Sequence, residues 1–175
     1  MIPTSSTTRG LTWSKISKKA GWELQHNGVV MGALQRTNLW KSEFQATTYH
    51  GSWMFRRKCG FHPITEIVDA NGVQIATLKQ NLTGAGTLTF SDGQTFQLKW
   101  KGFWRPVWTL FAGSDQALFS IDSHAKTVEP ISDLQLPEAR LNLLMVFAWH
   151  IIQQASEDAA ATAAIVVATS AVAMT

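Results

Sequence analysis

Apolar and polar residues alternate along much of the chain, and this alternation predicts β-strands. In residues 94–101, QTFQLKWK, the side chains of Phe96, Leu98 and Trp100 fall on one face and polar side chains fall on the other. Strict alternation of this kind is typical of a strand with one buried face. Residues 66–79, EIVDANGVQIATLK, contain two such strands around an Asn-Gly pair and therefore predict a complete hairpin.

Turn signals divide the chain into hairpins of similar length. The pairs Asn27-Gly28, Asn71-Gly72 and Asp92-Gly93 favour type I′ turns, in which both central residues have positive φ. Weaker signals lie at His50-Gly51 and at residues 113–115. The turns recur every 21 to 23 residues, a spacing that accommodates two strands of ordinary length and two turns.

The expected strands number about twelve, because single strands flank a series of five hairpins. A long run of consecutive antiparallel strands normally closes into a barrel, since closure removes the open edges. We therefore predict a mainly β fold, a closed antiparallel barrel built as a β-meander of about twelve strands. The expected hairpins are residues 23–36, 39–58, 66–79, 87–99 and 104–122, and the flanking strands are residues 11–16 and 126–131.

A different pattern begins at Pro137 and predicts a helix over about residues 137–156. Residues 141–152 are apolar apart from Asn142 and His150, and no polar stripe occurs at helical spacing. A helix that is apolar on every side must be surrounded by protein or lipid. A barrel of about twelve strands is too wide for its own side chains to fill, because about eight strands already enclose a filled interior. The sequence thus predicts that the helix lies inside the barrel.

A membrane-inserted C-terminus is the alternative interpretation of this region. A spanning helix needs about 20 apolar residues, whereas the run at 141–152 is shorter and the carboxylates of Glu157 and Asp158 follow it. We expect residues 1–10 to be a tail, residues 11–156 to be a single domain, and residues 157–175 to be an Ala-rich extension. Whether that extension is a helix, a strand or a membrane contact stays open, because alanine and β-branched residues have opposite preferences.

Composition supports a large interior and narrows the classes of function. Apolar residues make up 45% of the 175 residues and charged residues only 15%, below the usual quarter. The net charge of +3 is too small to indicate a nucleic-acid partner. The single cysteine, Cys59, favours a reducing compartment, and the first ten residues lack a secretory signal. These features predict a cytoplasmic location, with peripheral membrane contact as a further hypothesis.

The combination of hairpins and a terminal apolar helix resembles the tubby C-terminal-like superfamily, with its LURP-one-related and scramblase-like relatives. The residues that carry the resemblance are the hairpins at 66–79 and 87–100 and the helix LNLLMVFAWHII at 141–152. The resemblance covers roughly residues 11–156. It implies a twelve-stranded barrel wound around a hydrophobic helix.

The resemblance also implies functions for such a barrel. Tubby proteins associate with membranes through acidic phosphoinositide headgroups, and scramblases have a proposed lipid or calcium role. This chain departs from those relatives because it has no cysteine cluster for palmitoylation, no Pro-rich N-terminal segment and no acidic calcium-binding loop. The Ala-rich residues after Ser156 are an addition. No functional residue of the superfamily is therefore carried over to this sequence.

The sequence contains no complete catalytic or metal-binding pattern. Cys59 and His62 are close in sequence, but zinc needs at least three protein ligands and no second pair lies nearby. Asp122 and His124 are residue types that occur in catalytic triads, but the sequence contains no nucleophile motif to accompany them. We predict no catalytic residues, no metal and no cofactor, and hence a non-enzyme. An enzyme that uses a surface cleft is the alternative.

Basic residues are the candidates for a binding site. Exposed lysines on strands usually serve solubility, but clustered basic groups can also hold an anionic headgroup, at about 1 kcal/mol per residue near an acidic surface. We predict a binding module that contacts acidic phospholipid, another anionic ligand or a protein partner through an outer basic face. A protein that inserts its C-terminal segment into a membrane is the second hypothesis. The candidate residues are Arg56, Arg57, Lys58, Lys99, Lys101 and Arg105.

Overall fold

The computed structural model describes residues 10–16, 21–38, 42–58, 60, 63–81, 84–102, 104–132 and 136–172, with side chains described as far as residue 164. It consists of twelve antiparallel strands followed by one helix, α1, at Glu138–Val172. The strands are β1 Leu11–Lys15, β2 Gly21–His26, β3 Val29–Asn38, β4 Glu43–Thr48, β5 Gly51–Lys58, β6 Ile64–Asp69, β7 Gln74–Gln80, β8 Gly86–Phe90, β9 Thr95–Lys101, β10 Val107–Ala112, β11 Gln116–Asp122 and β12 Thr127–Pro130.

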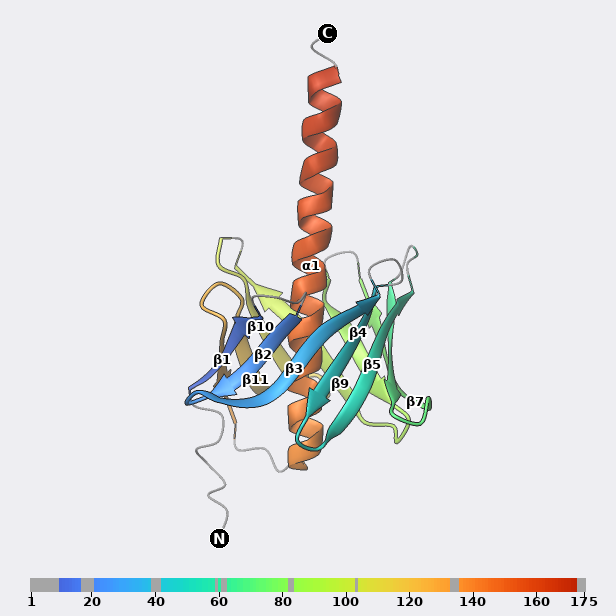
Figure 1. Ribbon diagram of the computed structural model, residues 1–175, viewed down its shortest axis with the longest axis vertical. Helices are drawn as coiled ribbons and strands as arrows, with labels where there is room; N and C mark the ends of the chain where they lie inside the picture. The colour runs from blue at the N-terminus through green and yellow to red at the C-terminus, as the bar shows by residue number, and fades with distance from the viewer. Residues whose placement is uncertain are drawn as a thin grey trace.

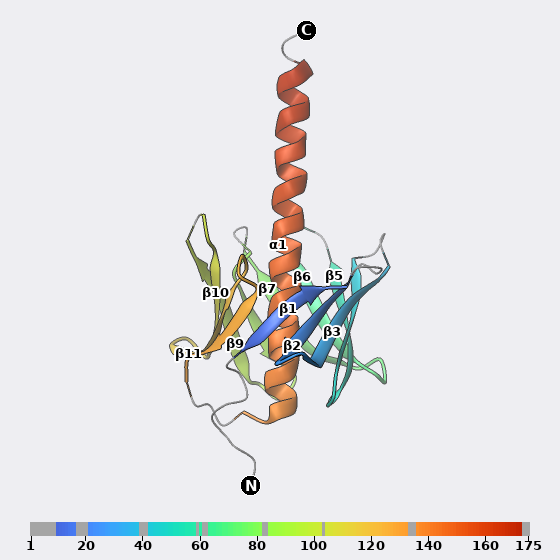
Figure 2. The same cartoon turned by 60° about the vertical axis from the view of Figure 1, so that its left-hand side comes forward.

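Each strand pairs with the next along the chain, and the first strand pairs with the last. The closing pair is short: Leu11 lies opposite Val128 and Thr12 lies opposite Thr127. The sheet therefore has no open edge, and it forms a closed barrel around α1 (Figures 1 and 2). The predicted twelve-stranded meander with a helix inside it is confirmed, including each expected hairpin.

The hairpin turns agree with the prediction at one site and differ at two. At Asn27-Gly28 both residues have positive φ, 51° and 80°, as a type I′ turn requires. At Asn71-Gly72 and Asp92-Gly93 only the glycine has positive φ, so the type I′ prediction is wrong there. The physical reason is visible at Asp69, whose carboxylate accepts hydrogen bonds from the backbone N–H groups of two residues of its own turn, at 2.9 and 2.8 Å.

Residues 142–152 of α1 lie in the lumen and are buried on all sides, as the sequence predicts. Trp149 is fully buried, its ring stacked on Trp13 at a centroid distance of 5.1 Å and meeting the edge of Trp22 at the same distance. Aromatic pairs at such distances add to the stabilisation from burial. The lumen is thus a packed core rather than a channel, and the helix contributes a large part of that core.

The helix ends later than the sequence predicted. Expected to end near residue 156, it continues without a break through the Ala-rich segment to Val172. Alanine has the highest helix propensity of all residues, so a preformed helix propagates through this segment more readily than it stops. Residues 159–164 are exposed, and the segment projects from one end of the barrel as a rod (Figures 1 and 2).

The helix packs most closely against β3 and β4. Small inward-facing residues allow this approach, because Ala46 is fully buried and a Cβ placed on Gly32 would lie 3.1 Å from Cγ2 of Val146. The wall formed by β9 and β10, on the other side of the barrel, carries tryptophans at Trp100 and Trp108. The helix is therefore held to one side of the lumen, and bulky side chains occupy the other.

Candidate functional site: the mouth of the barrel

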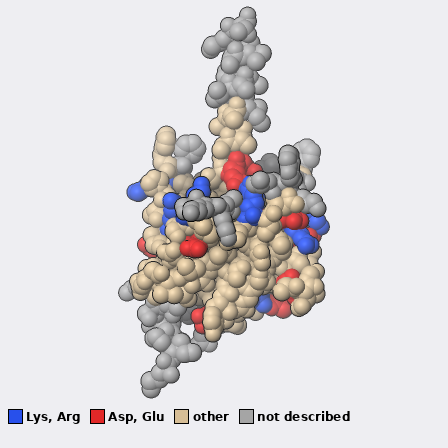
Figure 3. Space-filling view, in the orientation of Figure 1, with Lys and Arg blue, Asp and Glu red and all other residues tan. Residues whose placement is uncertain are grey.

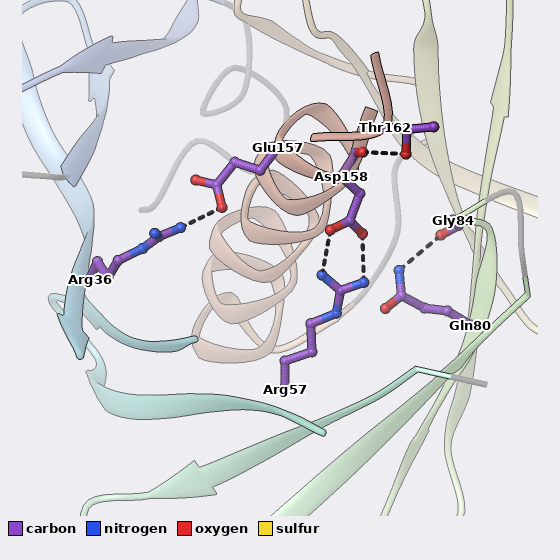
Figure 4. A network of polar contacts seen from close by, with 7 residues as sticks. All are labelled: Arg36, Arg57, Gln80, Gly84, Glu157, Asp158 and Thr162. Carbon is purple, nitrogen blue, oxygen red and sulfur yellow. Dashed lines mark hydrogen bonds and ion pairs between the residues drawn. The ribbon is translucent and has the colours of Figure 1, made fainter. Parts of the chain in front are cut away.

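We call the mouth the end of the barrel at which the odd-numbered strands finish and α1 leaves the lumen. Two ion pairs fix the helix there (Figure 4). Arg36 on β3 donates to Glu157 at 2.5 Å, and Arg57 on β5 binds both carboxylate oxygens of Asp158 at 3.0 and 2.6 Å. Bidentate arginine–carboxylate pairs have a fixed geometry as well as a favourable energy. The two pairs set the position of the helix relative to β3 and β5 as it emerges.

Arg57 differs from the sequence expectation of one basic face formed by Arg56, Arg57 and Lys58. Successive side chains on a strand point to opposite faces. Phe55, two residues before Arg57, is fully buried in the lumen, and Arg57 follows it inward to Asp158. Arg56 and Lys58 are exposed on the outer face, near Glu43 and Glu66 respectively.

A buried histidine, His150, lies in the lumen below the ion pairs. His150 is fully buried, and its ring lies 4.6 Å from Phe44 and 5.1 Å from Phe55, measured between centroids. Burial, with smaller contributions from the charges of Arg57 and Arg36, lowers the pKa of His150 from 6.5 to about 3. Neutral imidazole is therefore the form that the fold accommodates at physiological pH.

A cleft of about 630 Å³ opens at the mouth between α1 and the wall of β9 and β10. Three tryptophans line one side, namely Trp100, Trp104 and Trp108. Small or short side chains line the helical side, among them Ala155 and Ala159. The cleft exists because the helix packs toward β3 and β4 and presents small residues to the opposite wall.

The tryptophans of the cleft differ in exposure. Trp108 is buried, Trp100 is partly exposed, and Trp104 in the β9–β10 loop is 88% exposed. Trp100 and Trp108 are cross-strand partners with ring centroids 6.2 Å apart. Exposure of the tryptophans therefore increases along the wall of the cleft, from Trp108 in the packed core to Trp104 at the outer rim.

Basic residues surround the mouth. From β1 to β9, each odd-numbered strand carries a lysine or arginine among its last three residues, and loops at the same end add others. The space-filling view shows that most lysine and arginine atoms on that face lie in the half of the barrel nearer the helix exit (Figure 3). We call the exposed members the basic rim: Lys15, Arg56, Lys58, Lys79, Lys101, Arg105 and Lys126.

The predicted anion-binding residues do not form one outer face. Arg56 and Lys58 end β5, whereas Lys101 ends β9 and Arg105 follows it, and β6, β7 and β8 lie between them. Lys99 is directed away from the mouth, because its Nζ donates to the carbonyl of Ser114 in the β10–β11 turn. Four of the six candidates thus belong to the basic rim, at two separated places around it.

The opposite end of the barrel has the reverse charge. Acidic residues occupy its turns and the start of α1: Asp69, Asp92, Asp115 and Glu138. Arg140 lies at this end and donates to Asp92 at 2.8 Å. The far end therefore carries mainly acidic side chains, whereas the mouth combines the basic rim with the carboxylates of Glu43, Glu66, Glu157 and Asp158.

Other candidates from the sequence carry no site in the described residues. Cys59 and His62 lie outside the described part of the chain. No cluster of metal-binding side chains occurs within the described ranges. Nor does any described helix combine the length and apolar character needed to cross a bilayer.

Sequence reasoning missed the tryptophan-lined cleft and the ring-like distribution of the basic residues. A usable signal was present for the cleft, since Trp100 and Trp108 both occupy inward positions of their strands. The basic rim follows from chain direction, because every second strand end in a meander lies at the same end of a barrel. No family model, curated protein or solved structure matches the chain.

Proposed function

We propose that this chain is a non-enzymatic, tubby-like module that binds anionic membrane surfaces through its mouth. The observation that carries the proposal is an uncharged helical rod that projects from the centre of the basic rim. No lysine, arginine, aspartate or glutamate occurs after Asp158. An apolar element encircled by cations matches the two layers of a bilayer surface, the acyl chains and the acidic headgroups.

The length of the rod favours insertion into one leaflet. Residues 159–172 form a helix about 21 Å long at 1.5 Å per residue, and the hydrocarbon core of a bilayer is about 30 Å thick. The described part of the projecting helix is therefore shorter than the hydrocarbon core. The paired carboxylates of Glu157 and Asp158 mark the depth at which insertion stops, since charged groups are costly inside a membrane.

The basic rim supplies the electrostatic part of the binding. Each lysine or arginine near an acidic membrane contributes about 1 kcal/mol within a Debye length of the surface. Arg36 and Arg57 are paired with the helix, and Arg56 and Lys58 are paired with Glu43 and Glu66, so the other exposed residues of the rim carry most of this contribution. Trp104 adds an exposed amphipathic ring next to Lys101 and Arg105, a residue type enriched at membrane interfaces.

Co-sedimentation with vesicles tests the proposal. We expect the full chain to sediment with vesicles of phosphatidylcholine and phosphatidylserine, to sediment much less with phosphatidylcholine alone, and to be released by salt. Lys101→Glu combined with Arg105→Glu should weaken binding by about 30-fold or more, because two basic contacts of about 1 kcal/mol each are lost.

Two matched alanine variants separate insertion from general effects of charge. Ala164→Asp places a carboxylate on the projecting helix and should abolish sedimentation. Ala70→Asp places the same charge in an exposed turn at the opposite end of the barrel and should bind as the unaltered chain does. Equal binding of both variants contradicts the proposal. The proposal is also contradicted if the unaltered chain does not bind vesicles and instead forms a stable oligomer through the helix. The partner of the helix would then be a second copy of the chain.

A further inference from the structure

Beneath the ion pairs at the mouth, polar side chains lie along one line of α1. His150, Gln154 and Asp158 are spaced four residues apart and therefore share one face of the helix. Both ends of this line face β5, because the His150 ring lies 5.1 Å from the ring of Phe55 and Asp158 binds Arg57. Gln154, midway between them, therefore faces the same wall of the lumen, where it is only 3% exposed.

The neighbouring strands supply two more buried polar side chains. Thr65 on β6 is the cross-strand partner of Arg57, and it is fully buried. Gln80 on β7 lies diagonally from Thr65, since Thr65 pairs with Leu78 and Gln80 follows two residues later on the same face. Figure 4 shows the Gln80 amide directed toward α1, on the side of the helix that Arg57 approaches. We call these four buried residues the polar site: His150, Gln154, Thr65 and Gln80.

Six atoms of the polar site make no hydrogen bond to any described residue. They are both ring nitrogens of His150, both amide atoms of Gln154, the Thr65 hydroxyl and the side-chain oxygen of Gln80. The amide nitrogen of Gln80, by contrast, donates to the carbonyl of Gly84 at 3.2 Å. Most buried polar groups in folded proteins are bonded to protein or to ordered water, because a buried group without a partner lowers stability. The six atoms therefore call for a bound partner.

The position of α1 leaves room for a small partner here. The helix packs most closely against β3 and β4, so β6 and β7 stand farther from it. Arg57 reaches Asp158 across this distance with a long side chain, whereas Thr65, beside it on the wall, has a short one. Polar groups separated in this way are commonly bridged by water.

The chemistry of the six atoms identifies the partner. A neutral imidazole, an amide and a hydroxyl each present both a donor and an acceptor, and the Gln80 oxygen is an acceptor. An anion would satisfy only the donors, and a metal cation only the acceptors. Water does both, and a buried water typically makes about three hydrogen bonds. We propose that the polar site binds a cluster of about two or more ordered water molecules, which bridge α1 to β6 and β7.

The sign of one substitution distinguishes a hydrated site from a dry one. Thr65→Val removes the hydroxyl and nearly keeps the size of the side chain. We expect the equilibrium constant for folding to fall by about fivefold, the effect of one lost hydrogen bond. Removal of a dry, unbonded hydroxyl would instead raise the constant, because an unsatisfied buried group disappears.

Urea denaturation measures this change in the folding constant. Thr89→Val, at an exposed position of β8, is the matched control, since it reports the higher strand preference of valine alone. After correction by this control, a folding constant for Thr65→Val that is unchanged or raised overturns the proposal.

Magnetic relaxation dispersion of water detects long-lived buried waters directly. Gln154→Leu removes both amide atoms from the polar site and should reduce the contribution of long-lived waters. Gln153→Leu makes the same change at the adjacent helix position, which lines the cleft instead, and should leave that contribution unchanged. Equal dispersion for the two variants overturns the proposal.

A crystal structure of the unaltered chain gives a result that needs no substitution. Ordered water within hydrogen-bonding distance of Gln154 and Thr65 would support the proposal. Direct hydrogen bonds among His150, Gln154 and Thr65, with no water between them, would overturn it. Neither outcome depends on membrane binding, which is tested separately.

Discussion

Trp149→Ala should lower the free energy of unfolding by about 3–5 kcal/mol, the largest single-residue effect expected in this protein. Trp149 is fully buried at the centre of the lumen between Trp13 and Trp22. Its indole nitrogen makes no hydrogen bond to any described residue, so the loss comes from packing. The strands around it are tied into a closed barrel and cannot collapse to fill the space, which keeps the cavity cost high.

Chemical denaturation monitored by far-ultraviolet circular dichroism measures this effect. Trp104→Ala is the matched control, because Trp104 is 88% exposed and its removal should change the free energy of unfolding by less than about 0.5 kcal/mol. A loss below about 1 kcal/mol for Trp149→Ala would mean that α1 is not packed in the lumen.

His150 should make the protein sensitive to mild acid. Its pKa is about 3 in the folded chain and 6.5 for an exposed histidine. Between these two values the unfolded chain binds a proton that the folded chain excludes, so the free energy of unfolding falls as pH falls through this window. The slope is about 1.4 kcal/mol per pH unit, which amounts to about 2–3 kcal/mol between roughly pH 7.5 and pH 4.5.

Two aspartates with lowered pKa values, Asp92 and Asp122, affect the free energy of unfolding in a different pH range. The pKa of Asp92 is lowered, first by the backbone hydrogen bond from Gln94 and then by the bond from Arg140, and that of Asp122 is lowered first by the backbone N–H of Ala125. Their stabilisation is present above the ordinary aspartate pKa of 3.8 and is lost only below it. The loss expected above about pH 4.5 therefore belongs to His150.

Replacement of the histidine isolates its contribution. His150→Leu should flatten the dependence of the free energy of unfolding on pH between about 7.5 and 4.5, whatever its effect at neutral pH. His124→Gln, at an exposed turn, should keep the original slope. Urea denaturation at several pH values measures both variants, and a slope that survives His150→Leu would show that the buried imidazole is not its cause.

The sequence predicted the fold because each of its local patterns points to the same arrangement. Alternation in residues such as Phe96 and Leu98 fixes the inner face of a strand, and the turn glycines fix where strands end. The apolar helix then requires a lumen, and the meander supplies one. The length of the helix after residue 156 could not be derived from the sequence. The segment mixes alanine, which favours a helix, with β-branched residues, which favour a strand, and no burial pattern marks where the helix ends.

The site was less predictable because it depends on where strand ends meet in space. Proximity in sequence groups Arg57 with Arg56 and Lys58, but strand alternation directs its side chain inward to Asp158, more than a hundred residues away. Lys79 and Lys126, far from the predicted residues in sequence, lie at the same mouth as Lys101. Trp104 is an ordinary loop residue in sequence, and only the exit of the helix beside it makes a cleft.

The most direct test of the proposed function is the orientation of the protein on a vesicle. In a Cys59→Ser background, an environment-sensitive fluorophore is attached through Ala164→Cys on the projecting helix or through Ala70→Cys at the opposite end. With phosphatidylserine-containing vesicles, we predict a blue-shifted and brighter emission for the label at residue 164 and no change for the label at residue 70. A response at residue 70 alone, or equal responses at both, would contradict binding through the mouth.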